Sequence, residues 1–186
     1  DDPTLWQVPV SLMTRSDGSK KSSLIGEREG AMAVTTGSPG DWIKINPGQT
    51  GFYRVNYSQT DWESLRAAVS SLELPTTDRL GLQNDAYALT RAGFIDATSF
   101  VLLAKEYRNE IDASVWGDLS ANLRGLEMLI VGQPYLSSLH SFGRELFSQI
   151  VGKVGWDARP GEGHLDSLLR AIVLGQMGNY EDPETL

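Results

Sequence analysis

Cysteine is absent from this sequence of 186 residues, and histidine occurs only twice. Without cysteine, the chain can form neither disulfides nor thiolate metal sites. A zinc motif of the form H-E-x-x-H needs two histidines one helical turn apart, whereas His140 and His164 lie far apart in the sequence. The sequence therefore predicts that this chain itself carries neither catalytic nor metal-binding residues.

Positive charge and long apolar runs are also scarce. The chain has 16 Lys and Arg residues against 24 Asp and Glu residues, and its formal net charge is -8. Nucleic acids bind to positively charged surfaces, and a membrane-spanning helix needs ~18 to 20 apolar residues in succession. We therefore expect no nucleic-acid partner and no membrane-spanning segment.

The first 58 residues show the pattern of short β-strands. Trp6, Val8, Val10 and Leu12 alternate with more polar residues, as in a half-buried strand, and Pro9 predicts that this strand is an edge or carries a bulge. Turn-forming residues separate four further predicted strands, near residues 21–25, 31–36, 42–45 and 52–57. About five antiparallel strands are typical of part of a β-sandwich, which we assign to residues 1–58.

From residue 59 the apolar residues follow a helical period. Thr60 and Glu63 form a predicted capping box, and Asp78, Asp96 and Asp112 are predicted to begin the next three helices as N-caps. Two more helices are predicted after Pro134 and after Gly163. Six helices with short connections favour an all-α antiparallel array over residues 59–186 and an α+β chain overall.

Three segments carry a resemblance to a known family. They are Asp41–Tyr57 (DWIKINPGQTGFYRVNY), Asp78–Asp85 (DRLGLQND) and the stretch from Trp156 to Arg170 that contains PGEGHLD. Together they resemble the gluzincin-type zinc aminopeptidases, and the third segment resembles the puromycin-sensitive branch in particular. The resemblance covers nearly the whole chain in the family's order.

This resemblance implies a larger parent with an N-terminal β domain, a zinc domain, a small β-sandwich and a helical domain. The chain would supply most of the β-sandwich and the N-terminal part of a superhelical, HEAT-like domain. The resemblance implies a non-catalytic role in architecture and substrate gating for a cytoplasmic enzyme that removes N-terminal residues from peptides. Zinc and the peptide would bind to the parent, and the remaining domains would be this chain's partners.

Seven residues are candidates for structural or interdomain roles. Packing of the sandwich and of its junction with the helices is expected from the aromatic and basic residues Trp42, Tyr53, Arg54 and Tyr57. A helix cap and an interhelix ion pair are expected from the last three residues, Asp78, Arg79 and Asp85. A charged binding site built from the last three residues together with Arg91 is the alternative interpretation. No substrate-binding residue is predicted.

The ends of the sequence predict that the chain is a fragment. It starts with Asp1-Asp2-Pro3 rather than methionine, and Asp182-Pro183-Glu184 reads as a helix start close to the last residue. A fragment exposes apolar surface that its parent covers, so self-association is expected. Two other hypotheses stay open: an independent helical protein-interaction module with a β cap, and a small glycan-binding sandwich.

Overall fold

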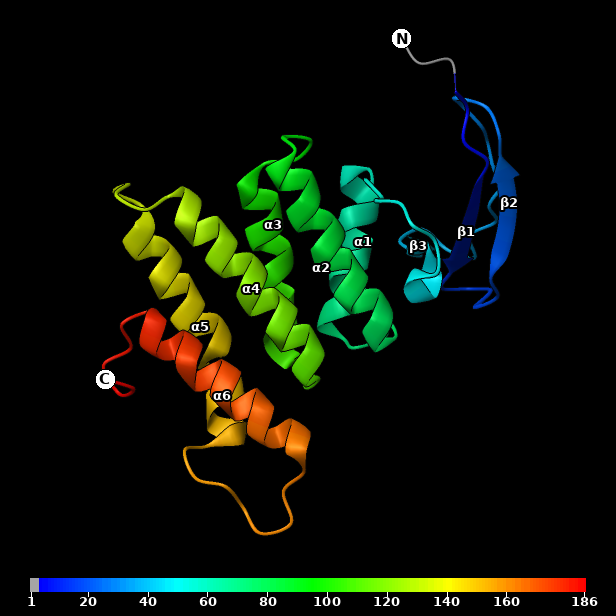
Figure 1. The fold of residues 1–186 in the computed structure, drawn as a ribbon. Coiled ribbons are helices and arrows are strands. Elements are labelled where there is room, and N and C mark those ends of the chain that lie inside the picture. Colours follow the sequence, from blue (N-terminus) through cyan, green and yellow to red (C-terminus); the bar gives the residue numbers. More distant parts are fainter. Residues whose placement is uncertain (1–3) are drawn as a thin grey trace. The chain divides into compact units, whose positions relative to one another are not determined.

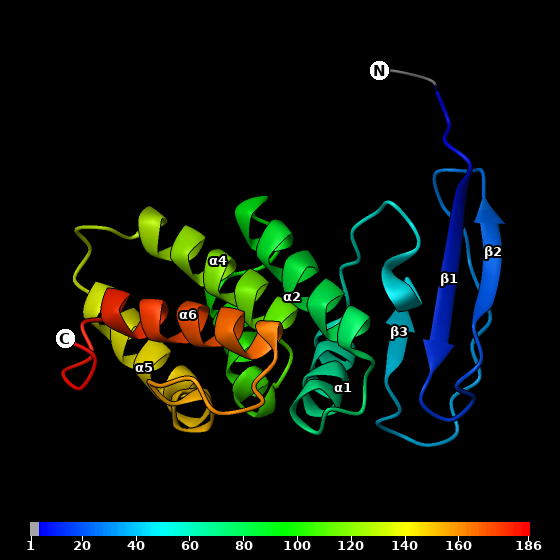
Figure 2. The same cartoon turned by 60° about the horizontal axis from the view of Figure 1, so that its bottom comes forward.

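The computed structural model describes residues 4–186, so the start of the chain at Asp1-Asp2-Pro3 lies outside the described residues. The chain divides into two compact units, one that ends at Ala68 and one that comprises Val69–Leu186. Each unit is described on its own below, and Figures 1 and 2 show their elements. The domain boundary expected at residue 58 stays a prediction.

The first unit contains a three-stranded antiparallel sheet of β1 (Val8–Thr14), β2 (Lys21–Ile25) and β3 (Ile43–Ile45), in the order β2-β1-β3 (Figure 2). The turn between β1 and β2 needs a left-handed residue, and Gly18 supplies it with φ 63°. The Gly18 N–H donates to the Thr14 carbonyl oxygen at 2.9 Å. This is the hairpin turn that the sequence predicts.

Pro9 lies where the central strand β1 has only one neighbour. It pairs with Leu24 of β2, whereas β3 pairs with β1 only from Leu12 to Thr14. The strand is thus an edge at Pro9 and central at Leu12, which is how the sheet accommodates a residue without an N–H.

Two predicted strands, at 31–36 and 52–57, are wrong. β2 and β3 already occupy the two edges of β1. Beyond β3, the Tyr57 hydroxyl takes the place of a strand: it accepts from the Ile45 N–H at 3.1 Å and donates to the Ile45 carbonyl oxygen at 3.3 Å. A side chain therefore bonds the backbone groups that a further strand would have used.

The helices confirm the predicted α+β class, with an antiparallel sheet followed by a helical array. They are α1 (Gln59–Ser70), α2 (Thr76–Arg91), α3 (Ala97–Ala104), α4 (Ala113–Leu129), α5 (Leu136–Val154) and α6 (His164–Asn179). Two short 3-10 helices, η1 (Pro47–Gln49) and η2 (Lys105–Asn109), complete the set. The predicted helix start at Asp182 is a single turn, in which the Thr185 and Leu186 N–H groups donate to the Asp182 carbonyl oxygen.

The predicted helix caps have mixed outcomes. Asp112 caps α4 as expected, because its Oδ1 accepts from the N–H groups of Ser114 and Val115. The capping box at Thr60 is wrong: Ser58 caps α1 instead, with its Oγ bonded to both the N–H and the carboxylate of Asp61. Asp78 is not the N-cap of α2 either, since the helix begins at Thr76 and Asp78 lies in its first turn.

In the second unit, α4 packs against both α2 and α6, and α5 packs against η2 and α6 (Figure 1). The face of α4 toward these helices is fully buried along Val115, Leu119 and Leu123. The i, i+4 spacing of these three residues follows the helical period that the sequence shows. None of the helices within residues 4–186 is both long enough and apolar enough to cross a membrane.

Candidate functional site

Tyrosine hydroxyls of the predicted site residues hold the backbone of the sheet. Tyr57 is buried and binds Ile45, and the hydroxyl of the half-buried Tyr53 accepts from the Ser11 N–H at 3.3 Å. Trp42 is buried next to β3, while Arg54 is exposed. The structure thus gives the two tyrosines a structural contact, and the interdomain role of these four residues stays a prediction.

The loop between β3 and these tyrosines is closed by one side chain. Asn46 lies in the left-handed region with φ 57°, and its amide brackets Gly51: Nδ2 donates to the Gly51 carbonyl oxygen at 2.9 Å and Oδ1 accepts from the Gly51 N–H at 2.7 Å. Asparagine tolerates this backbone region better than most residues. The bracket holds Phe52 fully exposed beside an open cavity of about 350 Å³.

Arg79 forms a buried ion pair. Its Nε donates to Glu110 Oε2 at 2.6 Å and its Nη2 donates to Glu110 Oε1 at 2.8 Å. This two-pronged contact is the strong geometry for a guanidinium and a carboxylate. The hydrogen bond to Glu110 is the main cause that raises the pKa of Arg79, so the group stays charged and has no proton to exchange in catalysis near neutral pH.

Glu110 joins the ion pair to the start of α4. Its Oε1 also accepts from the N–H groups of Ile111 and Asp112, at 2.8 and 2.9 Å, and its carbonyl oxygen accepts from Trp116 Nε1 at 3.1 Å. Sequence reasoning missed Glu110. The only local signal is a carboxylate at the junction of two helices, and its partner lies 31 residues away.

Asp78 and Asp85 lie on α2 with Arg79, and all three side chains are buried. The arginine pairs with Glu110 rather than with either aspartate, so an interhelix ion pair exists and its acid comes from outside the predicted set. The capping role predicted for Asp78 is wrong, because α2 begins at Thr76, and the structural role predicted for Asp85 stays a prediction.

The middle of the DRLGLQND motif joins α2 to α4. Gln83 Nε2 donates to the Val115 carbonyl oxygen at 2.9 Å. Asn84 donates to Asp118 at 2.9 Å and accepts from the Asn122 amide at 3.0 Å. These two amides were not among the predicted site residues, and their contacts explain why polar residues stand on the face of α2 that meets α4.

The two histidines have different surroundings. His140 Nε2 lies 2.7 Å from Glu127 Oε1, and His164 is exposed at the first residue of α6. Within residues 4–186, no three His, Cys, Asp or Glu side chains come close enough to hold a metal ion. The described side chains therefore do not fit the zinc that the resemblance implies for the parent.

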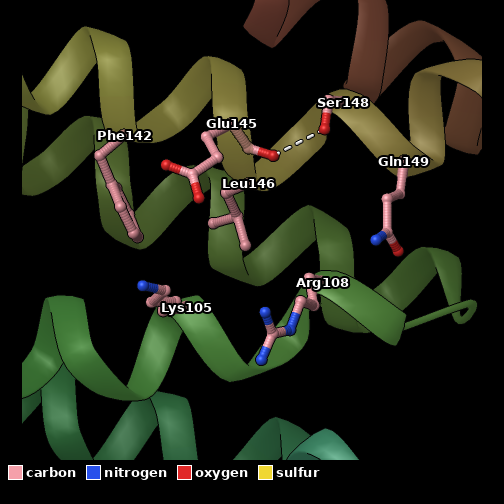
Figure 3. A pocket seen from close by; sticks show the side chains of 7 residues that line it. All are labelled: Lys105, Arg108, Phe142, Glu145, Leu146, Ser148 and Gln149. Atoms are coloured by element: carbon pink, nitrogen blue, oxygen red, sulfur yellow. Dashed lines mark hydrogen bonds between the residues drawn. The ribbon is translucent and has the colours of Figure 1, made fainter.

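A crevice between η2 and α5 is too small for an ordinary ligand. Its volume is about 140 Å³, against ~300 to 1,000 Å³ for typical ligand pockets. Figure 3 shows Lys105 and Arg108 of η2 opposite the α5 side chains. The lining residues are Lys105, Arg108, Phe142, Glu145, Leu146, Ser148 and Gln149.

A larger open cleft, of about 370 Å³, lies at the connection between α5 and α6. Its acidic groups already bind the loop itself: Glu162 pairs with Arg170, and Asp166 accepts from the Gly163 N–H at 2.9 Å. The Arg170 hydrogen bond lowers the pKa of Glu162. These contacts join the loop to α6.

Comparison with known proteins matches the chain to one family. A family model described as the ERAP1-like C-terminal domain matches residues 42–186, which include β3, the Asn46 loop and every helix.

Curated relatives match along almost the whole chain. Aminopeptidase M1 of Arabidopsis thaliana is 34% identical over 97% of this chain and 22% of its own length. The Puromycin-sensitive aminopeptidase of Caenorhabditis elegans is 30% identical over 100% of this chain and 20% of its own length. Aminopeptidase 2 of Candida albicans is 29% identical, also over 100% of this chain and 20% of its own length. The chain thus spans about a fifth of the length of these relatives, and it resembles the branch that the sequence predicts.

Proposed function

Because this chain belongs to the ERAP1-like C-terminal domain family, we propose that it acts as a non-catalytic segment of a zinc-dependent aminopeptidase that removes N-terminal residues from peptides. Its role there is architectural, and it limits the access of peptides to a zinc site elsewhere in the parent. The observation that carries this proposal is the family match over residues 42–186, together with relatives that are named aminopeptidases.

The contacts of the described residues suit such a role. The Arg79–Glu110 pair and the amides of Gln83 and Asn84 fix the geometry between helices, and none of them is arranged to activate water or a nucleophile. We assign zinc and the catalytic groups to the remaining domains of the parent, which are also the partners of this chain. A cytoplasmic location fits the absence of cysteine.

Hydrolysis of leucine 4-nitroanilide tests the non-catalytic assignment. The chain alone, with zinc added, should release no nitroaniline. The Arabidopsis Aminopeptidase M1, with its matching segment replaced by this chain, should be active, and the same enzyme with that segment deleted should be inactive. Zinc-dependent turnover by the chain alone would overturn the proposal, and so would equal activity of the deleted and the replaced enzymes.

Gating is tested separately with peptides of two lengths. If the segment limits access, the replaced enzyme should differ from the native Arabidopsis enzyme in its relative kcat/KM for a dipeptide anilide and for a peptide of about 15 residues, because access depends on size while the zinc chemistry is shared. An unchanged ratio over several peptide sequences would argue for an architectural role without gating.

The exposed apolar side chains between α4 and α5 favour a second candidate function, that of a helical protein-interaction module. This candidate predicts that the chain binds a partner without any peptidase domain. It is distinguished from the first by the replacement experiment, because an independent module has no reason to restore hydrolysis.

A further inference from the structure

The open cleft at the connection between α5 and α6 has a largely apolar lining. Ile150 and Val154 of α5 and Leu169 of α6 are buried where they line it, and Ile111, just before α4, is 61% exposed. The volume of about 370 Å³ falls within the ~300 to 1,000 Å³ of typical ligand pockets. All lining residues belong to the helical unit, and Figures 1 and 2 show the connection in orange.

Two cationic side chains of the cleft are free to meet a ligand. Lys153 lies in the last turn of α5 and Arg159 in the connection. The Arg159 N–H donates to Glu162 Oε2 at 3.2 Å, but neither cationic side chain forms a hydrogen bond or ion pair within residues 4–186. A Cβ at Gly155 would lie 3.6 Å from Arg159 Nη2, so this guanidinium reaches back to the end of α5, two residues after Lys153.

The two acids of the cleft are already bonded. Glu162 forms an ion pair with Arg170, and Asp166 Oδ2 accepts from the Gly163 N–H at 2.9 Å. Because the ion pair neutralises Glu162, two cations and one carboxylate remain, and Asp157 does not line the cleft. The lining therefore has a local excess of positive charge in a chain whose net charge is -8.

A buried arginine fixes the wall of the cleft. Arg170 of α6 donates from Nη2 to the Val154 carbonyl oxygen at 3.0 Å and from Nε to the Gly155 carbonyl oxygen at 3.2 Å. These carbonyls stand at the C-terminal end of α5, where the helix dipole is negative and repels anions. Arg170 counters this repulsion, and since it also binds Glu162, it joins α5, the connection and α6 before any ligand arrives.

We propose that this cleft binds a free fatty acid of medium chain length. Its carboxylate lies between Lys153 and Arg159, because a guanidinium and an ammonium form strong charge-assisted hydrogen bonds with a carboxylate. Its hydrocarbon chain covers Ile111, Ile150 and Leu169 and so removes apolar surface from water. This inference goes beyond the proposed aminopeptidase role and does not depend on it.

The lining favours this ligand over other anions. An inorganic anion would leave the apolar side chains in contact with water, and the amide groups of a peptide would need hydrogen-bond partners that the side chains of Ile111, Ile150, Val154 and Leu169 lack. Octanoate has about ten non-hydrogen atoms, and at typical binding energies per atom its dissociation constant should be on the order of 1 mM.

Titration of the whole chain with octanoate, followed by amide NMR, tests the proposal. The shifts should concentrate on residues of the cleft. Lys153→Gln combined with Arg159→Gln should raise the dissociation constant by at least about tenfold. The matched control is Lys105→Gln combined with Arg108→Gln, which removes the same charge at the crevice of Figure 3 and should leave the constant unchanged.

The apolar contact is tested with a third variant and with two other ligands. Ile111→Gln should raise the constant about threefold, because it removes apolar contact with the chain. Acetate has the carboxylate without the chain, and octylammonium has the chain with the opposite charge, so both should bind at least about tenfold more weakly than octanoate. Circular dichroism should show all variants equally folded, since each substituted side chain is exposed.

Three results would overturn the proposal. The first is octanoate that shifts no amide of the cleft at about 20 mM, well above the expected constant. The second is binding that the Lys153 and Arg159 double variant retains or that the control double variant weakens equally. The third is binding of acetate or octylammonium as tight as that of octanoate, which would identify a bare anion site or an adventitious amphiphile only.

Discussion

Aromatic side chains are used differently before and after Val69. In the first unit, the Tyr53 and Tyr57 hydroxyls bond the backbone of the strands. In the helical unit, the Trp116 and Phe147 rings pack with centroids 4.7 Å apart, and Trp116 Nε1 bonds the Glu110 carbonyl oxygen between two helices. A helix bonds most of its own backbone groups, but a strand of three residues depends on its neighbours. The backbone of a short strand therefore depends on side-chain hydrogen bonds more than the backbone of a helix does.

Ion pairs in this molecule differ in burial. Lys21 and Asp17 pair on the exposed hairpin at 2.9 Å, while Arg79 and Glu110 pair inside the helical unit. An exposed pair is weakened by water and salt, whereas removal of one member of a buried pair leaves a charge without water or a partner. The following predictions test these contrasts, from the largest expected effect to the smallest.

Breaking the buried ion pair should have the largest effect. Arg79→Leu should lower the free energy of unfolding by about 3–5 kcal/mol, because it leaves the Glu110 carboxylate buried without its cation. The measurement is urea unfolding followed by circular dichroism. The double variant with Glu110→Leu should recover part of the loss, since no buried charge then remains.

Lys21→Gln is the matched control for the exposed pair, and little change in stability is expected. If Arg79→Leu were no more destabilising than Lys21→Gln, the contrast between buried and exposed pairs in this molecule would be wrong.

Ring packing in the helical unit can be tested at two glycines of α5. A Cβ at Gly143 would lie 2.3 Å from the Tyr180 ring, whereas a Cβ at Gly152 meets nothing within 4 Å. Gly143→Ala should therefore destabilise the chain by about 1–3 kcal/mol through overpacking. Gly152→Ala should stabilise it by about 0.5–1 kcal/mol, because alanine favours the helix. Thermal unfolding of both variants provides the comparison, and stabilisation by Gly143→Ala would contradict the close contact with Tyr180.

Removing a single hydroxyl compares the two units directly. Tyr57→Phe leaves both the N–H and the carbonyl oxygen of Ile45 without this partner, so a loss of about 1–2 kcal/mol is expected. Tyr107→Phe removes a bond to the Arg79 carbonyl oxygen, which also accepts a bond within α2, so the loss should be only about 0.5–1 kcal/mol. Chemical denaturation measures both, and the reverse order would contradict the argument that strands rely more on hydroxyls than helices do.

The smallest effect concerns the acid dependence of stability. The Arg170 hydrogen bond lowers the pKa of Glu162 below its ordinary 4.5. A carboxyl with a lowered folded pKa stabilises the fold above its unfolded pKa and loses this contribution as the pH falls through the folded value. Wild type and Glu162→Gln should therefore differ in Tm at pH 7 and converge as the pH falls below about 4.

Asp17 provides the corresponding test in the first unit. Its hydrogen bond with Ser19 is the main cause that lowers its pKa below the ordinary 3.8, so the Tm values of wild type and Asp17→Asn should converge at still lower pH. A difference in Tm that persists undiminished in acid, for either pair, would exclude the carboxylate as its source.

The sequence predicts the helices well because their signals are local. The stripe of Val115, Leu119 and Leu123 and the cap at Asp112 both belong to one helix. The predicted strand at 52–57 fails for the opposite reason. An alternating pattern of apolar and polar residues shows that a segment can be extended. Whether it pairs depends on which neighbouring strands have free backbone groups, and the Tyr57 hydroxyl bonds the backbone of Ile45.

The candidate site shows the same limit. Arg79 was identified from its motif, but its partner Glu110 was not, because the pair connects residues 31 positions apart. The contacts of Gln83 with Val115 and of Asn84 with Asp118 likewise depend on how α2 packs on α4. Family resemblance located the motif, and only the packed helices show what its polar residues bind.

The hydroxyl of Tyr57 also affects what the sheet does in a crowded solution. An open strand edge is a template on which a foreign strand can add, which is a common route to aggregation. At Ile45 both backbone groups of that edge are already bonded to Tyr57. One oxygen atom thus closes the β3 edge to a foreign strand at Ile45.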